Sequence, residues 1–249
     1  MLNKITIPSA IRKAVAKAIA DFAMIKENDA ILIGLSGGKD SLTLIHVLRS
    51  IQQYAPVKFS IAAVTVDYQN PNYQPASLIP YLESLEIKHF YIRENIVQMA
   101  KDHMGKNSYT AFSSRMRRGI IYQTARVNGY NVIALAQHAD DILSSFFMSL
   151  WFEGNLQTMK AHYTINQGDL RVIRPLCYAR EQWMKDFSLK HNLPIVPEDV
   201  PSEFSAPKER ASIKEWLASV EKEDAQKIQK TLRAITPMLR QSFYDHKNC

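Results

Sequence analysis

The stretch from residue 30 to residue 48, AILIGLSGGKDSLTLIHVL, constrains the fold of this chain more than any other. It opens with a continuous apolar run of strand length, Ala30 to Leu35, and from Leu42 its apolar residues follow helical spacing. Two adjacent glycines, a lysine and two serines lie between these segments. A strand, a glycine loop and a helix in this order form a unit in which the free N–H groups of the helix face the loop. That geometry binds phosphate.

The alternation of strands and helices continues along the chain. We expect strands at 58–66, 87–92, 131–136 and 171–174, and helices at 9–25, 42–51, 76–86, 94–103, 113–128, 139–152 and 180–191. Residues 153–171 are expected to form a loop, and two amphipathic helices at about 208–220 and 222–240 are expected to form a C-terminal appendage. We therefore predict an α/β fold with a doubly wound parallel sheet and a small C-terminal helical region.

Composition narrows the possible partners. The formal net charge of +7 suits a polyanion such as RNA, or a phosphorylated substrate. The N-terminus has no apolar core of signal-peptide length, and no stretch is long and apolar enough to span a bilayer, so we expect a cytoplasmic protein without a membrane partner. Two distant cysteines, Cys177 and Cys249, provide neither a disulfide framework nor a metal-knuckle spacing.

Polar residues follow every predicted strand. In open parallel sheets, ligands bind beyond the carboxyl ends of the strands, so these residues mark a candidate active-site rim. They are Ser36 to Ser41, Asp67, Arg93 and Glu94, Gln137 to Asp141, and Arg174.

The glycine loop is not a Walker loop. Gly34 is followed by only three residues before the Gly38-Lys39 pair, and Asp40 stands where a Walker motif has serine or threonine. The string S-G-G-K-D-S, residues 36–41, resembles instead the pyrophosphate loop of the PP-loop ATP pyrophosphatases, which split ATP into AMP and pyrophosphate. Glycines at 37 and 38 let such a loop turn tightly around phosphate groups.

Further motifs are similar to those of one branch of this superfamily, the tRNA 2-thiocytidine synthetases. The similar segments are 18–22, 66–67, 81–85, 114–119, 140–143, 173–176 and 180–181, in the same order along the chain. The resemblance implies an enzyme that adenylates O2 of an anticodon-loop cytidine and then replaces that oxygen with sulfur. It implies ATP and Mg²⁺ as cofactors, tRNA as the partner and a homodimer, and an external sulfur donor is a further candidate partner. Together with the residue pattern, we expect a basic N-terminal helix at 1–27, the PP-loop ATP-binding domain at 28–200 and a helical region at 201–249.

The resemblance also implies roles for particular residues. ATP or pyrophosphate would be bound by Ser36, Gly37, Gly38, Lys39, Asp40, Ser41, Val66, Asp67 and Gln137. Asp40, Asp140 and Asp141 would hold Mg²⁺, and Lys39, Asp40, Asp141 and Cys177 would be catalytic. A simpler alternative is that Asp140 or Asp141 caps the helix that starts there.

Four arginines are candidates for contact with RNA. Arg115, Arg117 and Arg118 fall on one predicted helix, and Arg174 follows a predicted strand. Guanidinium groups suit RNA phosphates or the charge that develops at an α-phosphate. The alternative for the three helical arginines is a solvated helix face.

The sequence departs from the branch at the residues that handle sulfur. Where the family has cluster-binding cysteines, this chain has Thr110, Ser113, Ala179, Glu198 and Pro201. A 4Fe–4S cluster needs three or four thiolates, so we predict no iron–sulfur cluster. Cys177 is then the only plausible thiol carrier near the cleft, although a lone cysteine in such a loop is commonly a small buried hydrophobe.

The residues after the fourth predicted strand also depart from the superfamily. Its Gly-His pair reads Ala136-Gln137 here, and His138 matches only the second histidine of a related pair. Three functions therefore stay open. They are an adenylating tRNA-modifying enzyme that uses external sulfide or persulfide, a ligase with a nitrogen or small-molecule nucleophile, and a non-catalytic nucleotide- or RNA-binding derivative.

Overall fold

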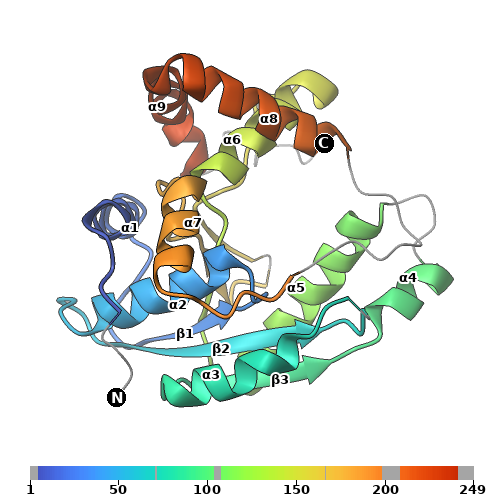
Figure 1. Ribbon diagram of the computed structural model, residues 1–249. Helices are drawn as coiled ribbons and strands as arrows, with labels where there is room; N and C mark the ends of the chain where they lie inside the picture. The colour runs from blue at the N-terminus through green and yellow to red at the C-terminus, as the bar shows by residue number, and fades with distance from the viewer. Residues whose placement is uncertain (1–4, 71, 104–107, 166, 198–207, 241–249) are drawn as a thin grey trace.

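The computed structural model describes residues 5–70, 72–103, 108–165, 167–197 and 208–240 (Figure 1). Glu198, Pro201 and Cys249 lie outside the described residues. The strands are β1 Asp29–Gly34, β2 Phe59–Asp67, β3 His89–Arg93, β4 Val132–Ala134, β5 His162–Thr164 and β6 Arg171–Ile173. The helices are α1 Ser9–Asp21, α2 Lys39–Gln52, α3 Leu78–Ser84, α4 Ile96–His103, α5 Tyr109–Val127, α6 Ala139–Met148, α7 Glu181–Lys190, α8 Lys208–Glu223 and α9 Ala225–Ile235. Short helical turns lie at Pro75–Ser77 (η1), Ser149–Glu153 (η2) and Thr236–Leu239 (η3).

The strands form one sheet in the order β3-β2-β1-β4-β6-β5. Neighbouring strands are parallel except for β5, which pairs antiparallel with β6. Apolar residues alternate between the faces of β1, so that Ile31 and Ile33 join the core under α1, α2, α3 and α7, whereas Leu32 joins the core under α5. Helices therefore cover both faces, which confirms the doubly wound α/β prediction (Figure 1).

The sheet is mostly, and not wholly, parallel. Strand β5 lies in segment 153–171, which was expected to be a loop, so that expectation is wrong for His162–Thr164. Three residues are too few to show a period, and β5 exists because its residues pair with Arg171–Ile173 of β6. Helix α5 also begins earlier than residue 113, because the side chain of Ser108 accepts a hydrogen bond from the Ala111 N–H and caps it.

The order of strands reverses at the boundary between β1 and β4. From β1 the chain moves outward through β2 to β3, then returns through α5 to β4 on the other side of β1. A network of polar side chains joins the starting ends of these strands. Asp29 accepts hydrogen bonds from Asn131 and Arg171, and Asn131 in turn accepts one from the Ala30 N–H. The opposite, carboxyl ends of β1 and β4 therefore meet at the point where open sheets bind ligands.

The C-terminal helices pack on the rest of the molecule. Helix α8 lies against α6, and α9 contacts both, as Figure 1 shows in the upper part of the view. Ile213 of α8 and Ile228 of α9 belong to the same apolar core as Ile11 of α1. The division of the chain into three regions stays a prediction. Within the described ranges, no helix combines the length and apolar character needed to cross a bilayer.

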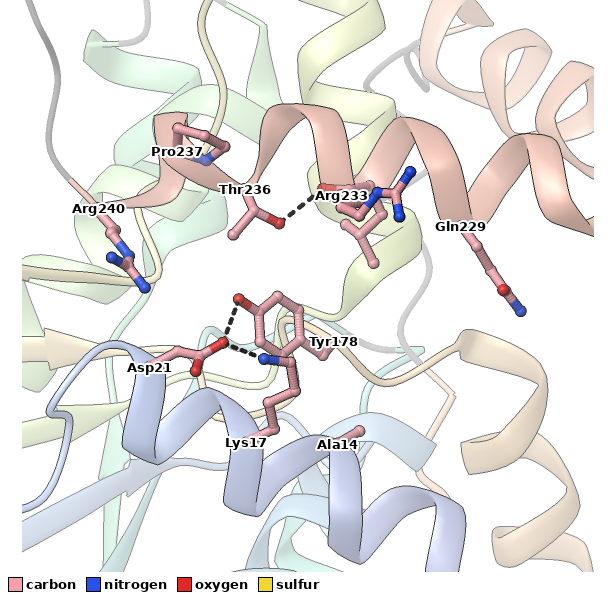
Figure 2. A pocket seen from close by; sticks show the side chains of 10 residues that line it. Ala14, Lys17, Asp21, Tyr178, Gln229, Arg233, Thr236, Pro237 and Arg240 are labelled. Carbon is pink, nitrogen blue, oxygen red and sulfur yellow. Dashed lines mark hydrogen bonds and ion pairs between the residues drawn. The ribbon is translucent and has the colours of Figure 1, made fainter.

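A groove of about 1110 Å³ lies between α1 and the α9–η3 segment (Figure 2). Asp21 on its α1 side accepts hydrogen bonds from Lys17 Nζ at 2.7 Å and from the Tyr178 hydroxyl at 3.1 Å. Arg233 and Arg240 belong to the opposite wall. The groove is therefore lined by basic side chains from both ends of the described chain.

Candidate functional site

The segment Ser36–Ser41, here called the phosphate loop, follows β1 and leads into α2. Gly37 adopts a left-handed conformation with φ +85°, and a Cβ atom there would lie 2.8 Å from the Cβ of Val196. The loop is held by two further contacts: the Val196 N–H donates to the Gly37 carbonyl at 3.0 Å, and the Tyr73 hydroxyl donates to the Ser36 carbonyl at 2.8 Å. Because α2 begins directly at Lys39, the loop lies at the helix end that attracts anions.

The two serines of the loop lie close to each other. Ser36 Oγ and Ser41 Oγ lie 3.4 Å apart. The Gly38 N–H donates to Ser36 Oγ at 3.3 Å, and Ser41 Oγ donates to the Gly38 carbonyl at 2.9 Å. These bonds give the loop a defined shape and place both hydroxyls beside its backbone amides.

His138 lies at the centre of the site, after β4, and its side chain is 1% exposed. Its Nε2 atom is 3.3 Å from Asp141, 3.8 Å from Asp40 and 4.0 Å from Glu181, and its Nδ1 atom is 3.5 Å from Asp140. Burial lowers the pKa of His138, but the contact with Asp140 and the charges of Asp141 and Asp40 outweigh it, so its pKa is raised above the ordinary value. The structure thus surrounds one histidine with four carboxylates, here called the carboxylate cluster.

Two lysines offset the negative charge of the cluster. Lys39 Nζ donates to Glu181 Oε1 at 2.8 Å and to Asp40 Oδ2 at 3.2 Å. Lys214 of α8 lies 3.3 Å from Asp141 and 3.5 Å from Glu181. Burial lowers the pKa of Lys39, but the carboxylates of Glu181 and Asp40 outweigh it and raise the pKa, which keeps the ammonium group charged.

Asp140 is fully engaged by protein groups. It accepts hydrogen bonds from Arg180 Nη2 at 2.8 Å and from the Glu181 N–H at 2.7 Å, which caps α7. Arg180 also donates to Glu221 Oε1 of α8 at 2.7 Å. Burial raises the pKa of Asp140, but His138 and Arg180 outweigh it, so its pKa lies well below the ordinary range. This bonding argues against the prediction that Asp140 holds Mg²⁺, because its oxygens already have partners.

Asp40 is bonded differently. Its Oδ1 atom is buried and has no hydrogen-bond partner among the described residues. Burial raises the pKa of Asp40, only partly offset by His138 and Lys39. A buried carboxylate oxygen without a partner is unfavourable, and a bound cation would satisfy it.

The residues fit a magnesium ion shared with a substrate. No group of three or more His, Cys, Asp or Glu side chains in the described part of the chain could hold a metal by itself. Mg²⁺ is commonly held by only one or two carboxylates together with substrate phosphates, so Asp40, whose Oδ1 has no partner among the described residues, could supply one ligand. Asp141 stays a predicted second ligand, although Lys214 and His138 already lie 3.3 Å from its oxygens. Asp141 also accepts a hydrogen bond from the His138 N–H at 3.3 Å and so caps the start of α6. The alternative role predicted for Asp141, a helix cap, is therefore compatible with metal binding.

The predicted adenosine border at the end of β2 is well ordered by local bonds. Val66 is buried, and Asp67 accepts hydrogen bonds from the Gln69 N–H at 2.9 Å and from the Tyr91 hydroxyl at 2.7 Å. Asp67 therefore shapes the turn after β2. Contact of Val66 and Asp67 with adenosine stays a prediction.

Gln137 and Arg174 bond to each other. Arg174 Nε donates to Gln137 Oε1 at 2.9 Å, and its Nη1 donates to the Lys160 carbonyl. Arg174 is 7% exposed, and burial lowers its pKa. The structure argues against the prediction that Arg174 contacts RNA, because its guanidinium group instead ties β6 to the segment after β4. The role predicted for Gln137 at the nucleotide is untested.

The three arginines of α5 do not form one patch. Arg115 lines a groove of about 550 Å³ between α5 and β3, whereas the Arg117 guanidinium lies 5.3 Å from the ring centre of Tyr68, next to the end of β2. Arg118 is exposed, and its Nε donates to the Ser114 carbonyl at 3.2 Å. The guanidinium group of Arg117 thus lies beside the end of β2. RNA contact by all three arginines stays a prediction.

Cys177 is fully buried, with 0% exposure, and burial raises the pKa of its thiol to about 12. A thiolate is the reactive form of cysteine, so this environment argues against the prediction that Cys177 is catalytic. Ser113 and Ala179, at two of the family's cysteine positions, are buried as well. The residues at the cluster positions do not fit an iron–sulfur cluster, since neither these two nor Thr110 supplies a thiolate.

Sequence reasoning assigned no role to several residues that the fold brings to the site. The Arg180-Glu181 pair was noted only as part of the resemblance, and His138 only as a single histidine. Lys214 and Glu221 lie on α8, and no pattern in the sequence indicated that this helix packs beside the carboxylate cluster.

A protein-family model described as a PP-loop domain matches residues 8–217, which include the phosphate loop and the whole carboxylate cluster. The chain belongs to the PP-loop family. Its relatives include a tRNA-cytidine(32) 2-sulfurtransferase of Pectobacterium carotovorum, 37% identical over 98% of this chain and 78% of that protein. Another protein of the same name, from Serratia proteamaculans, is 42% identical over 79% of this chain and 63% of its own length. The predicted resemblance to the thiocytidine branch of the PP-loop proteins is confirmed.

Solved structures support the fold of this PP-loop protein. A U34-tRNA thiolase from Methanococcus maripaludis, described with its [4Fe-4S] cluster, superposes with a TM-score of 0.70 at 18% identity, covering 92% of this chain and 78% of that one. An NH3-dependent NAD synthetase from Campylobacter jejuni superposes with a TM-score of 0.50, also at 18% identity, over 93% of this chain and 89% of its own. At this identity the likeness concerns the fold alone.

The two glycines of the PP-loop should respond differently to alanine. Gly37→Ala forces a side chain into a left-handed conformation against Val196, so we expect it to lower the free energy of unfolding by about 2 kcal/mol. Gly38 has φ −69°, and a Cβ there meets only Ser36 Oγ at 3.5 Å, so Gly38→Ala should cost much less. Urea unfolding of both variants measures the difference, and equal losses would contradict the loop geometry.

The thiol of Cys177 should be inert in the folded protein. In a Cys249→Ser variant, Cys177 is the only thiol, and at about pH 8 its raised pKa and burial should prevent reaction with a disulfide reagent. Denaturant should expose it and give one thiol per chain. Rapid labelling of the native variant would restore Cys177 as a candidate sulfur carrier.

Proposed function

We propose that this chain is an ATP-dependent tRNA-modifying enzyme that adenylates a base oxygen of tRNA and lets sulfur replace it. The names of the sequence relatives support a cytidine of tRNA as the substrate. The observation that carries the proposal is the pairing of an anion site with a cation site. The preshaped phosphate loop lies at the N-terminus of α2, and beside it Asp40 Oδ1 is buried without a partner in the part of the chain that the structure describes.

In the proposed first step, the base oxygen bonds to the α-phosphorus of ATP and the bond from that phosphorus to the bridging oxygen breaks. Pyrophosphate leaves, and the amides of the phosphate loop with Lys39 stabilise its charge. Lys39 now bonds to Glu181 and Asp40, so a bound phosphate would compete with Glu181 for it. Mg²⁺, when bound by Asp40 and Asp141, would neutralise further phosphate charge.

In the second step, hydrosulfide from an external donor attacks the activated base carbon, AMP leaves with the original oxygen, and the added sulfur loses its proton. If the donor is a persulfide, the first product is a disulfide between the base and the donor, and a second thiol of the donor must attack the donor sulfur of that disulfide to release the thio-base. We propose an external donor without a resident iron–sulfur cluster for two reasons. First, the thiol of Cys177, the cysteine within the described residues, is buried. Second, the family's cysteine positions are occupied here by Thr110, Ser113 and Ala179. A homodimer belongs to this proposal through the resemblance only, and a cytoplasmic location through the expectation from the sequence.

A second candidate is a PP-loop ligase with a nitrogen or small-molecule nucleophile. The burial of Cys177 favours it, because such a reaction needs no cysteine. The two candidates share the adenylation step and differ in what displaces AMP. Mass spectrometry of nucleosides from the treated tRNA separates them, since only one introduces sulfur.

The test is a pyrophosphate-release assay with the full chain, ATP, Mg²⁺ and bulk tRNA, with and without sulfide. We expect release that depends on tRNA, and we expect Asp40→Asn and Ser41→Ala to slow it roughly 100-fold or more by removing the ion ligand and a loop donor. The matched control is Asp169→Asn, which breaks an exposed ion pair with Arg126 outside the site and should leave the rate unchanged.

Two results would contradict the proposal. ATP binding without turnover on tRNA or amines would indicate a non-catalytic derivative. Stoichiometric iron in protein purified anaerobically would overturn the cluster-free mechanism.

A further inference from the structure

Three aromatic side chains form a cluster at the far end of α6, here called the aromatic platform: Phe147, Trp151 and Trp216. Their ring centres lie 4.9 to 5.1 Å apart, each ring in contact with the other two. Trp151 is 51% exposed and Trp216 39% exposed, although indole rings usually lose most of their surface on folding. The platform therefore exposes apolar ring surface to water, and contiguous exposed apolar surface is typical of a binding site.

The backbone at the end of α6 holds Trp151 in place. The α-helix continues as a π-helical turn, Ser149–Glu153, which ends at Gly154 with φ +66°. Such turns are rare, and they occur frequently at functional sites. Phe152 and Leu156 in the same segment are 59% and 65% exposed, so the segment adds further apolar surface beside the platform.

The platform is built on two elements that also reach the carboxylate cluster. Helix α6 carries Asp140 and Asp141 in its first turn and ends at the platform, and α8 carries both Lys214, which lies 3.3 Å from Asp141, and Trp216. Figure 1 shows these helices side by side. With a rise of about 1.5 Å per residue, Trp151 lies roughly 15 Å along the helix from Asp141. A few nucleotides of an unpaired RNA loop can span that distance.

We infer that the aromatic platform stacks unpaired bases of the substrate RNA next to the base that reacts at the carboxylate cluster. This inference rests on the proposed function, and it adds a base-binding site to it. Aromatic rings are the groups with which proteins bind splayed-out RNA bases, and stacking accepts any base because each has a flat face.

A second copy of the chain is a less suitable occupant. The exposed side chains of this surface are Trp151, Phe152, Leu156 and Trp216. Together they expose on the order of 400 Å² of apolar area, whereas a stable interface buries about 800 Å² from each partner. The other large apolar residues with high exposure, Tyr54, Val127, Leu189 and Ile195, belong to other elements and do not enlarge this surface.

The test uses the fluorescence of tryptophan, which base stacking quenches. The chain has three tryptophans, and the third, Trp183, lies on α7 outside the platform. We expect a stem–loop RNA to quench the wild type and Trp183→Phe, and to quench Trp151→Phe and Trp216→Phe less. A paired duplex of the same length should quench none of them.

Binding of the same RNA without ATP gives a second measurement. Trp151→Ala should weaken binding roughly tenfold, whereas Trp151→Phe, which keeps a ring, should weaken it less. Tyr54→Ala, an exposed aromatic residue elsewhere, is the control and should bind like the wild type. Circular dichroism confirms that each variant folds.

Three outcomes would overturn the inference: no RNA binding by the wild type, equal binding by Trp151→Ala and the wild type, or a dimer that Trp151→Ala converts to monomers. Failure of the proposed function looks different. In that case the RNA binds and quenches the platform, but the wild type releases no pyrophosphate.

Discussion

The parallel pairing of β1 with β4 is the constraint on which the rest of the site depends. It brings together two segments that are far apart in the sequence, the phosphate loop and the residues from Gln137 to Asp141. The polar network of Asp29, Asn131 and Arg171 fixes the opposite ends of the same strands. Hydrogen bonds therefore fix the starting ends of β1 and β4, and the residues of the candidate site follow their carboxyl ends.

Arg180 connects this sheet edge to the C-terminal helices. It bridges Asp140 at the start of α6 and Glu221 on α8, and α7 begins directly after it. Because charge-assisted bonds of this kind are strong and directional, the position of α8 is coupled to the position of the carboxylate cluster. Lys214 and Trp216 on α8 are thereby held in fixed relation to the residues proposed to act on ATP.

The sequence alone was sufficient for the fold class and the phosphate loop, because both depend on local patterns. Continuous apolar runs indicated buried strands, and the spacing from Gly34 to the Gly38-Lys39 pair excluded a Walker loop. The role of His138 could not be predicted in this way, since its environment comes from carboxylates on α2, α6 and α7 that only the fold assembles. Strand β5 was missed because its pairing with β6 is a tertiary contact.

The misjudged side chains share one physical cause. Cys177 and Arg174 follow strand β6, where polar residues were expected to face a cleft, but both are buried beneath neighbouring segments. The place of a residue directly after a strand predicts the edge of the sheet at which it lies. It does not predict whether the following segment of chain buries that residue.

The hydrogen bond from the Val196 N–H to the Gly37 carbonyl has a consequence for biosynthesis. The glycine motif leaves the ribosome early, yet the amide that closes it is made only after all six strands. A nascent chain therefore carries the motif long before it acquires its shape. The hydrogen bond that closes the phosphate loop can therefore form only after residue 196 has been synthesised.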